Sequence, residues 1–191
     1  MNNKRVSPEQ LTTRLIDLEN KLGISVAKII INLRKEFDDS DIEKQLNKLA
    51  DAIYKENRNI FIKGTNGYVN ELKIKYLIAR LSLAYNISVN SIVVVEYDDL
   101  LRGIKGFNDK DREMLDNLFD RENKIIYISG IRNYIEGADY KPTISSVWSK
   151  VYDYSLGNPD VIVMGSSLYS IIEYESITDN YSKFKSLFNK M

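Results

Sequence analysis

The sequence predicts an α/β protein whose parallel sheet is covered by helices on both faces, in three layers. Four short apolar runs rich in β-branched residues alternate with longer segments of helical periodicity. Continuously apolar strands are typical of sheets covered on both faces, and right-handed crossovers distribute the helices between those faces. We expect this α/β domain over residues 39–178, preceded by a small helical hairpin over 1–38 and followed by a C-terminal helix over 179–191.

The N-terminal portion predicts two helices. Ser7 and Pro8 are typical of a helix start, and the apolar stripe that follows them ends at Gly23. A second helix is expected over 25–37, and it is more apolar than an exposed helix requires because it contains Ile29, Ile30 and Ile31. Two interpretations stay open. We favour a hairpin packed on its own core, and the alternative is a partner-binding arm that uses the three isoleucines.

The next segment has the layout of a phosphate-binding loop. A third helix is expected from Ser40, which forms a capping box with Glu43, to about Glu56. The apolar strand Ile60–Ile62 follows, and a helical pattern begins near Glu71 after two glycines, Gly64 and Gly67. In such a strand, glycine turn and helix, backbone N–H groups at the helix start face an anion.

The chemistry of a phosphate-binding loop is missing from this segment. Such a loop needs a further glycine, a lysine for the β- and γ-phosphates and a hydroxyl for Mg²⁺. Counted from Gly64, those places hold Val69, Asn70 and Glu71. Tyr68, at the tip of the turn, could stack on a base or on a partner side chain. Packing of this tyrosine on its own domain is the interpretation that we favour.

The remaining elements alternate in the same way. Their expected positions are a strand at 91–96, helices at 97–103 and 108–121, a strand at 124–130, an irregular loop at 132–143, a helix at 145–155, a strand at 160–164 that ends at Gly165, Ser166 and Ser167, a short element near Ile171, and a final amphipathic helix through 181–188. Asp98 and Asp99 fit the start of a helix better than a metal site, because adjacent helical residues face different ways.

Composition narrows the chemistry that the chain can perform. The sequence has no cysteine and no histidine, which excludes disulfides, thiolate nucleophiles, zinc–sulfur sites and the usual general base. We expect no metal and no cofactor.

No apolar run has the length of a membrane span or a signal peptide, so we expect a cytoplasmic protein. Residues 1–80 carry 15 Lys and Arg against 11 Asp and Glu, a mild excess of positive charge.

The order of elements resembles one family over about Ser40 to Ile172. The segments SIVVVEYDDLLRGIKG and VWSKVYDYSLGNPDVIVMGSSL are similar to the second strand and to the strand before the sensor-1 position of the bacterial helicase loaders, the DnaC/DnaI proteins, and of IstB-type AAA+ ATPases. The resemblance implies a P-loop AAA+ fold and a polar sensor at Ser166 or Ser167. It also implies ATP binding, contact with single-stranded DNA and the loading of a hexameric helicase.

The sequence departs from that family at the residues that handle nucleotide. The third strand ends in Ser129 and Gly130, where the family's Walker B motif has acidic residues; Glu96 would be the acid in a rival register. We therefore expect a protein that does not hydrolyse ATP and that binds a replicative helicase or partner ATPase during replication of a phage, plasmid or other mobile element.

Two alternatives stay open beside that expectation. One is a DNA-binding accessory module that uses the basic N-terminal portion. The other is a carboxylate-based enzyme on an unrelated α/β fold, which the lack of histidine and cysteine makes the weakest of the three. The sequence leaves the oligomeric state open.

Overall fold

The computed structural model of the protein describes residues 7–37, 41–64, 66–105, 109–120, 122–131, 141–167 and 186–188. Within these residues the chain forms four strands, seven α-helices and a short 3₁₀ helix. The elements in chain order are α1 (Pro8–Leu22), α2 (Val26–Phe37), α3 (Ile42–Glu56), β1 (Ile60–Ile62), α4 (Gly67–Tyr85), η1 (Val89–Ser91), β2 (Ile92–Glu96), α5 (Tyr97–Lys105), α6 (Asp109–Leu118), β3 (Ile125–Ile131), α7 (Lys141–Gly157) and β4 (Ile162–Ser167).

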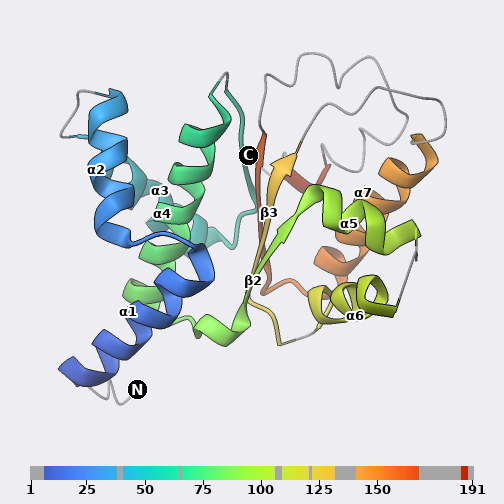
Figure 1. The fold of residues 1–191 in the computed structure, drawn as a ribbon, viewed down its shortest axis with the longest axis horizontal. Coiled ribbons are helices and arrows are strands. Elements are labelled where there is room, and N and C mark those ends of the chain that lie inside the picture. The colour runs from blue at the N-terminus through green and yellow to red at the C-terminus, as the bar shows by residue number, and fades with distance from the viewer. Residues whose placement is uncertain are drawn as a thin grey trace.

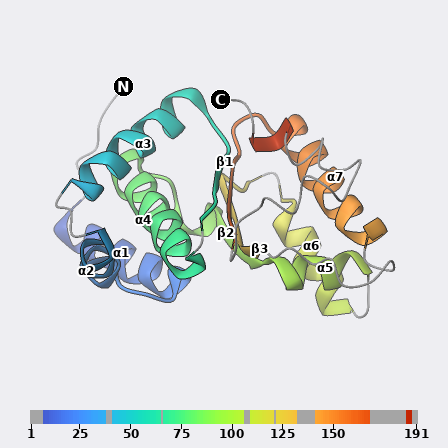
Figure 2. The ribbon, with the colours of Figure 1, turned by 90° about the horizontal axis from the view of Figure 1, so that it is seen from above.

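The four strands form one parallel sheet in the order β1-β4-β3-β2. This confirms the predicted α/β class with a parallel sheet. The chain crosses from β1 at one edge to β2 at the other and then returns through β3 to β4. Because parallel crossovers are right-handed, connections that run in opposite directions place their helices on opposite faces. Figures 1 and 2 show this result, with α1 to α4 on one side of the sheet and α5 to α7 on the other.

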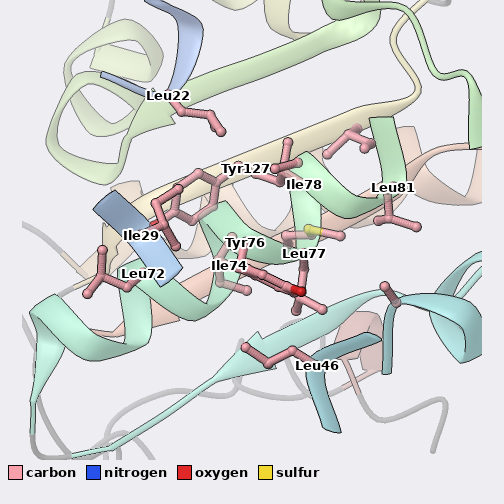
Figure 3. Packing of buried hydrophobic residues seen from close by; sticks show 14 of the residues in the cluster. Leu22, Ile29, Leu46, Leu72, Ile74, Tyr76, Leu77, Ile78, Leu81 and Tyr127 are labelled. Atoms are coloured by element: carbon pink, nitrogen blue, oxygen red, sulfur yellow. The ribbon is translucent and has the colours of Figure 1, made fainter. Parts of the chain in front are cut away.

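The N-terminal helices share a core with the sheet. Ile29 and Leu33 of α2 are fully buried in the same cluster as α4, and Tyr127 of β3 belongs to that cluster (Figure 3). α4 can lie between α2, α3 and the sheet because it is apolar around most of its circumference. Arg14, in the middle of α1, holds that helix to the C-terminal end of α4 by donating to the Asn86 side chain and to the Ile87 carbonyl.

A second cluster fills the opposite face of the sheet. The ring of Trp148 in α7 is stacked on Tyr97, with 5.7 Å between ring centroids, and contacts Phe188 edge-on. Phe188 also packs against Phe61 of β1. Leu187 and Phe188 are therefore buried, as an amphipathic C-terminal segment requires, whereas most of the helix predicted there and the element near Ile171 lie outside the described residues.

Several predicted boundaries are wrong. α4 begins at Gly67 and not near Glu71, because Asn66 caps it by accepting a hydrogen bond from the N–H of Val69 at 3.2 Å. β4 continues through Ser167, since its last residues still pair with β1 and β3. α7 begins at Lys141, inside the segment expected to be an irregular loop; a proline in the first helical turn is tolerated there.

The predicted start of α3 is tested only in part. The N-cap residue is Asp41, which makes no capping hydrogen bond through its side chain. Ser40, the expected partner of Glu43 in a capping box, lies outside the described residues.

Candidate functional site

The candidate site lies at the carboxyl ends of β1 and β4. The chain leaves β1 toward α4 on one face of the sheet and leaves β3 toward α7 on the other face. Crevices at such a switch of direction are where open parallel sheets bind their ligands. Gly64, two residues after the end of β1, and Ser167, the last residue of β4, lie at this point, and the first turn of α4 points its N–H groups toward it.

Asn70 fills the place that a phosphate-binding lysine would take. Its side chain is only 3% exposed, and its amide Nδ2 donates to the carbonyl oxygen of Ser167 at 3.0 Å. The same Nδ2 lies 3.4 Å from the carbonyl oxygen of Gly64. A Cβ atom on Gly64 would come within 2.9 Å of Asn70 Oδ1, so a glycine is needed for this close approach. The loop is therefore tied to the sheet by a neutral amide.

The neighbours of Asn70 also use their polar groups for contacts within the chain, which leaves fewer of them for an anion. Asn66 satisfies the N–H of Val69, one of the donors that a helix start could offer to phosphate. Glu71 carries a negative charge near the same helix start and forms an ion pair with Lys75, one turn later, at 2.7 Å. The ammonium group of Lys75 is consequently bound to a carboxylate of its own helix.

The predicted sensor serines are buried within β4. Ser166 Oγ and the hydroxyl of Tyr127 are 2.9 Å apart in a buried hydrogen bond. Burial raises the pKa of Tyr127 well above its usual range, and the Ser166 contact offsets part of that shift. Ser167 Oγ is buried and has no hydrogen-bond partner among the described residues, while its carbonyl holds Asn70.

The two residues expected at the Walker B position lie near the end of β3 and serve the sheet. Ser129 Oγ lies 3.4 Å from the carbonyl oxygen of Val95 in β2, and Gly130 has a left-handed φ of 66°. The β3–β4 register shifts between Ile128 and Ile131, so Gly130 supplies the conformation that this irregularity needs. Glu96 ends β2, at the sheet edge opposite β1.

Only some of the residues predicted to bind a partner are exposed at the surface. Ile29 is fully buried against α4 and is unavailable to a partner, because its helix face is the one that packs. Ile30 is half-buried and Ile31 is 53% exposed. Tyr68 is not at a loop tip: it lies in the first turn of α4, and its hydroxyl accepts a hydrogen bond from Asn32 of α2 at 2.7 Å.

Two features of the site were not expected from the sequence: the capping role of Asn66 and the contact of Tyr127 with Ser166. An asparagine directly before a helical pattern is a recognised cap signal, so the first could have been found. The second could not, because the two residues belong to different strands.

In the described part of the chain, no group of three or more acidic side chains is arranged to hold a metal ion. No helix there has the length and apolarity needed to cross a bilayer.

No family model matches this chain. No curated protein and no solved structure matches it either. The resemblance to the helicase loaders therefore depends on the order of elements and on the residues quoted above.

Proposed function

We propose that this protein is an AAA+-like domain that does not hydrolyse ATP and that acts by binding a protein, a replicative helicase or a partner ATPase, in the replication of a mobile element. The observation that carries the proposal is the buried amide of Asn70, which is hydrogen-bonded to the carbonyls of Gly64 and Ser167. A triphosphate needs donors and positive charge at this place. Here the Asn70 side-chain amide and the N–H of Val69 are used within the chain.

The position of this amide supports the proposal further. A parallel sheet with helices on both faces and a glycine turn at its switch point is the scaffold expected of a nucleotide-binding domain. The scaffold is kept while the groups for phosphate and Mg²⁺ are replaced by Asn70 and Glu71. A domain that keeps its architecture without that chemistry can still serve through its surfaces.

The DNA-binding alternative takes second place because several basic side chains of the N-terminal portion are already engaged. Arg34 pairs with Glu43 at 2.5 Å, and Lys75 pairs with Glu71. The ammonium of Lys73 lies 4.4 Å from the centroid of the Phe37 ring, and burial lowers its pKa. Phosphate contacts need cations that are free to reach the backbone of the nucleic acid.

Isothermal titration with Mg·ATP tests the loss of nucleotide chemistry. The natural chain is expected to give no binding heat. The triple variant Val69→Gly, Asn70→Lys, Glu71→Thr restores the full phosphate-loop pattern from Gly64 onward and is expected to gain binding. A matched variant with Asn70→Gln in place of the lysine should gain none. Thermal unfolding of all three proteins shows whether each is folded.

Two outcomes contradict the proposal. Micromolar binding of Mg·ATP by the natural chain, with measurable turnover, would make it an active ATPase. A folded triple variant that fails to bind would remove the phosphate-loop interpretation of this turn. Fluorescence anisotropy with single- and double-stranded DNA at low and high salt tests the alternative, since phosphate-driven binding weakens steeply as salt rises.

The partner itself is tested with the purified hexameric replicative helicase of the host. Size-exclusion chromatography with light scattering should give a complex whose mass does not depend on added ATP. A complex that forms only in the presence of DNA would instead favour the accessory-module alternative.

A further inference from the structure

The strand β2 forms one edge of the sheet, and half of its backbone groups point outward. Its only neighbour among the described strands is β3. The carbonyl of Ser91 accepts from Lys124 N at 2.8 Å, and the carbonyl of Val95 faces Ser129, so alternate residues from Ser91 onward turn toward β3. By the period of two along a strand, Val94 directs its N–H and C=O groups to the open edge, and Glu96 directs its N–H there. The carbonyl of Glu96 directly precedes α5 and accepts the first hydrogen bond of that helix.

A groove of about 450 Å³ runs along this open edge. It is bounded by α4 on one face of the sheet and by α5 and α6 on the other, the two layers that Figure 2 shows on either side of β2. Three consecutive valines of β2 form its floor, and polar side chains from the three helices form its walls. The residues that line it are Glu71, Lys75, Val93, Val94, Val95, Glu96, Asp99, Glu113, Asn117, Leu118 and Ser129.

The walls of this groove are acidic. Four carboxylates line it against a single cation, Lys75, which is paired with Glu71. Asp99 is paired with Arg102, three residues later in α5. No ion pair found among the described side chains uses Glu96 or Glu113. Glu96 lies at the α4 side of the groove and Glu113 lies on α6, so both walls offer negative charge.

We propose that this groove binds an extended segment of a partner protein that carries lysine or arginine, and that the segment joins the sheet beside β2 as an added strand. Addition to an exposed edge is an established mode of peptide recognition, in which main-chain hydrogen bonds give affinity and alternate side chains give specificity. The N–H and C=O of Val94 and the N–H of Glu96 supply the hydrogen bonds, while side chains of the added strand reach Glu96 on one face and Glu113 on the other. β2 spans five residues, which sets the length of the paired segment.

The negative charge of the groove favours a basic partner over a second copy of this chain. Edge strands that only need protection carry charges or bulges on the strand itself. Here Val93, Val94 and Val95 leave the middle of β2 without any charge, and the carboxylates lie around it. Two copies paired edge to edge would turn their acidic groove walls toward each other, and facing surfaces of like charge disfavour association.

The proposal is tested with a fluorescent seven-residue peptide of alternating lysine and valine. Anisotropy should show saturable binding that weakens with salt. A glutamate peptide of the same pattern should not bind. The lysine peptide with alternate backbone nitrogens methylated keeps its charge but loses its donors, so its affinity should fall at least about tenfold.

Matched variants locate the binding on the protein. Glu96→Lys with Glu113→Lys should weaken the lysine peptide by about tenfold or more, whereas Glu36→Lys, an exposed position on α2, should not. Val94→Pro removes an outward N–H and should weaken binding while the fold persists, because edge strands tolerate proline where the N–H faces outward. Amide NMR shifts should concentrate on β2.

The inference is overturned if the lysine peptide does not bind, if the methylated or glutamate peptide binds equally well, or if the groove variants bind as the natural chain does. Concentration-dependent dimerisation that these variants abolish would make a second copy the occupant and would also overturn it. The inference rests on the proposed function only in taking the partner to be a protein. Its failure is separable, because the peptide experiment contains no nucleotide and no helicase.

Discussion

The side-chain amide of Asn70 donates to the carbonyl oxygen of Ser167 at 3.0 Å and so joins the first turn of α4 to the end of β4. The two residues are 97 positions apart in the chain, and the Asn70 side chain is almost fully enclosed. One neutral side chain thus links the glycine turn, α4 and a central strand of the sheet.

Asn70→Ala should destabilise the protein by about 1–3 kcal/mol, because buried carbonyls lose their donor. Asn70→Asp should cost more at neutral pH, since an ionised carboxylate only accepts hydrogen bonds and would face the carbonyl oxygens of Gly64 and Ser167. Urea unfolding measures both variants. Asn20→Ala, at an exposed position near the end of α1, is the control. If Asn70→Ala is as stable as that control, the amide is not structural.

Gly165→Ala should destabilise the protein by about 1–3 kcal/mol, the usual cost of overpacking a tight core. An added Cβ would lie 2.8 Å from Phe61 Cδ2 and 3.1 Å from Ile131 Cδ1. At Gly157, near the end of α7, the same change meets no atom within 4 Å and should be neutral or stabilising by up to about 1 kcal/mol. Thermal unfolding should therefore show a lower midpoint for Gly165→Ala but not for Gly157→Ala. Equal shifts would show that β1 and β4 do not pack as described.

Ile29→Ala should destabilise the protein by about 2–5 kcal/mol, as expected for a truncated core residue. Ile31→Ala, two residues later at an exposed position, should change stability by less than about 0.5 kcal/mol. The comparison decides between a helix packed on the domain and a free arm. If both changes were neutral by denaturant unfolding, α2 would not be docked on α4.

Stability should fall as pH rises above about 10, the ordinary tyrosine pKa. Burial raises the pKa of Tyr127, so above that pH the unfolded chain releases a proton that the folded chain keeps. The folded state then binds more protons, and the free energy of unfolding decreases with pH. Below pH about 10 both states are protonated and Tyr127 adds no pH dependence.

Tyr127→Phe removes that titration and should make the alkaline loss of stability shallower. Ser166→Ala removes the same hydrogen bond but keeps the phenol of Tyr127. The stability of this variant should therefore still fall steeply as pH rises. Urea unfolding at a series of alkaline pH values measures the slopes. Tyr76 and Tyr85, whose pKa values are also raised, remain in both variants and supply a common background. Identical slopes for the two variants would contradict the assignment to Tyr127.

Local signals were enough to predict much of the fold. The cap at Ser7, the left-handed end at Gly23 and the apolar runs of the strands all lie within a few residues of the elements that they specify. Such signals act over one turn or one strand. The α/β class and the parallel sheet follow from their alternation, which is why they could be predicted before the strands were placed.

The sequence by itself determined that this protein has a parallel α/β architecture and a glycine turn without phosphate-binding groups. Only the tertiary structure decided what Asn70 holds, which face of α2 is buried, and that β2 is the edge of the described sheet beside acidic walls. The physical reason is separation along the chain: strand order brings together residues from different elements, and the pattern within any one element does not specify its neighbours. The contact of Asn70 with Ser167 is a product of that order.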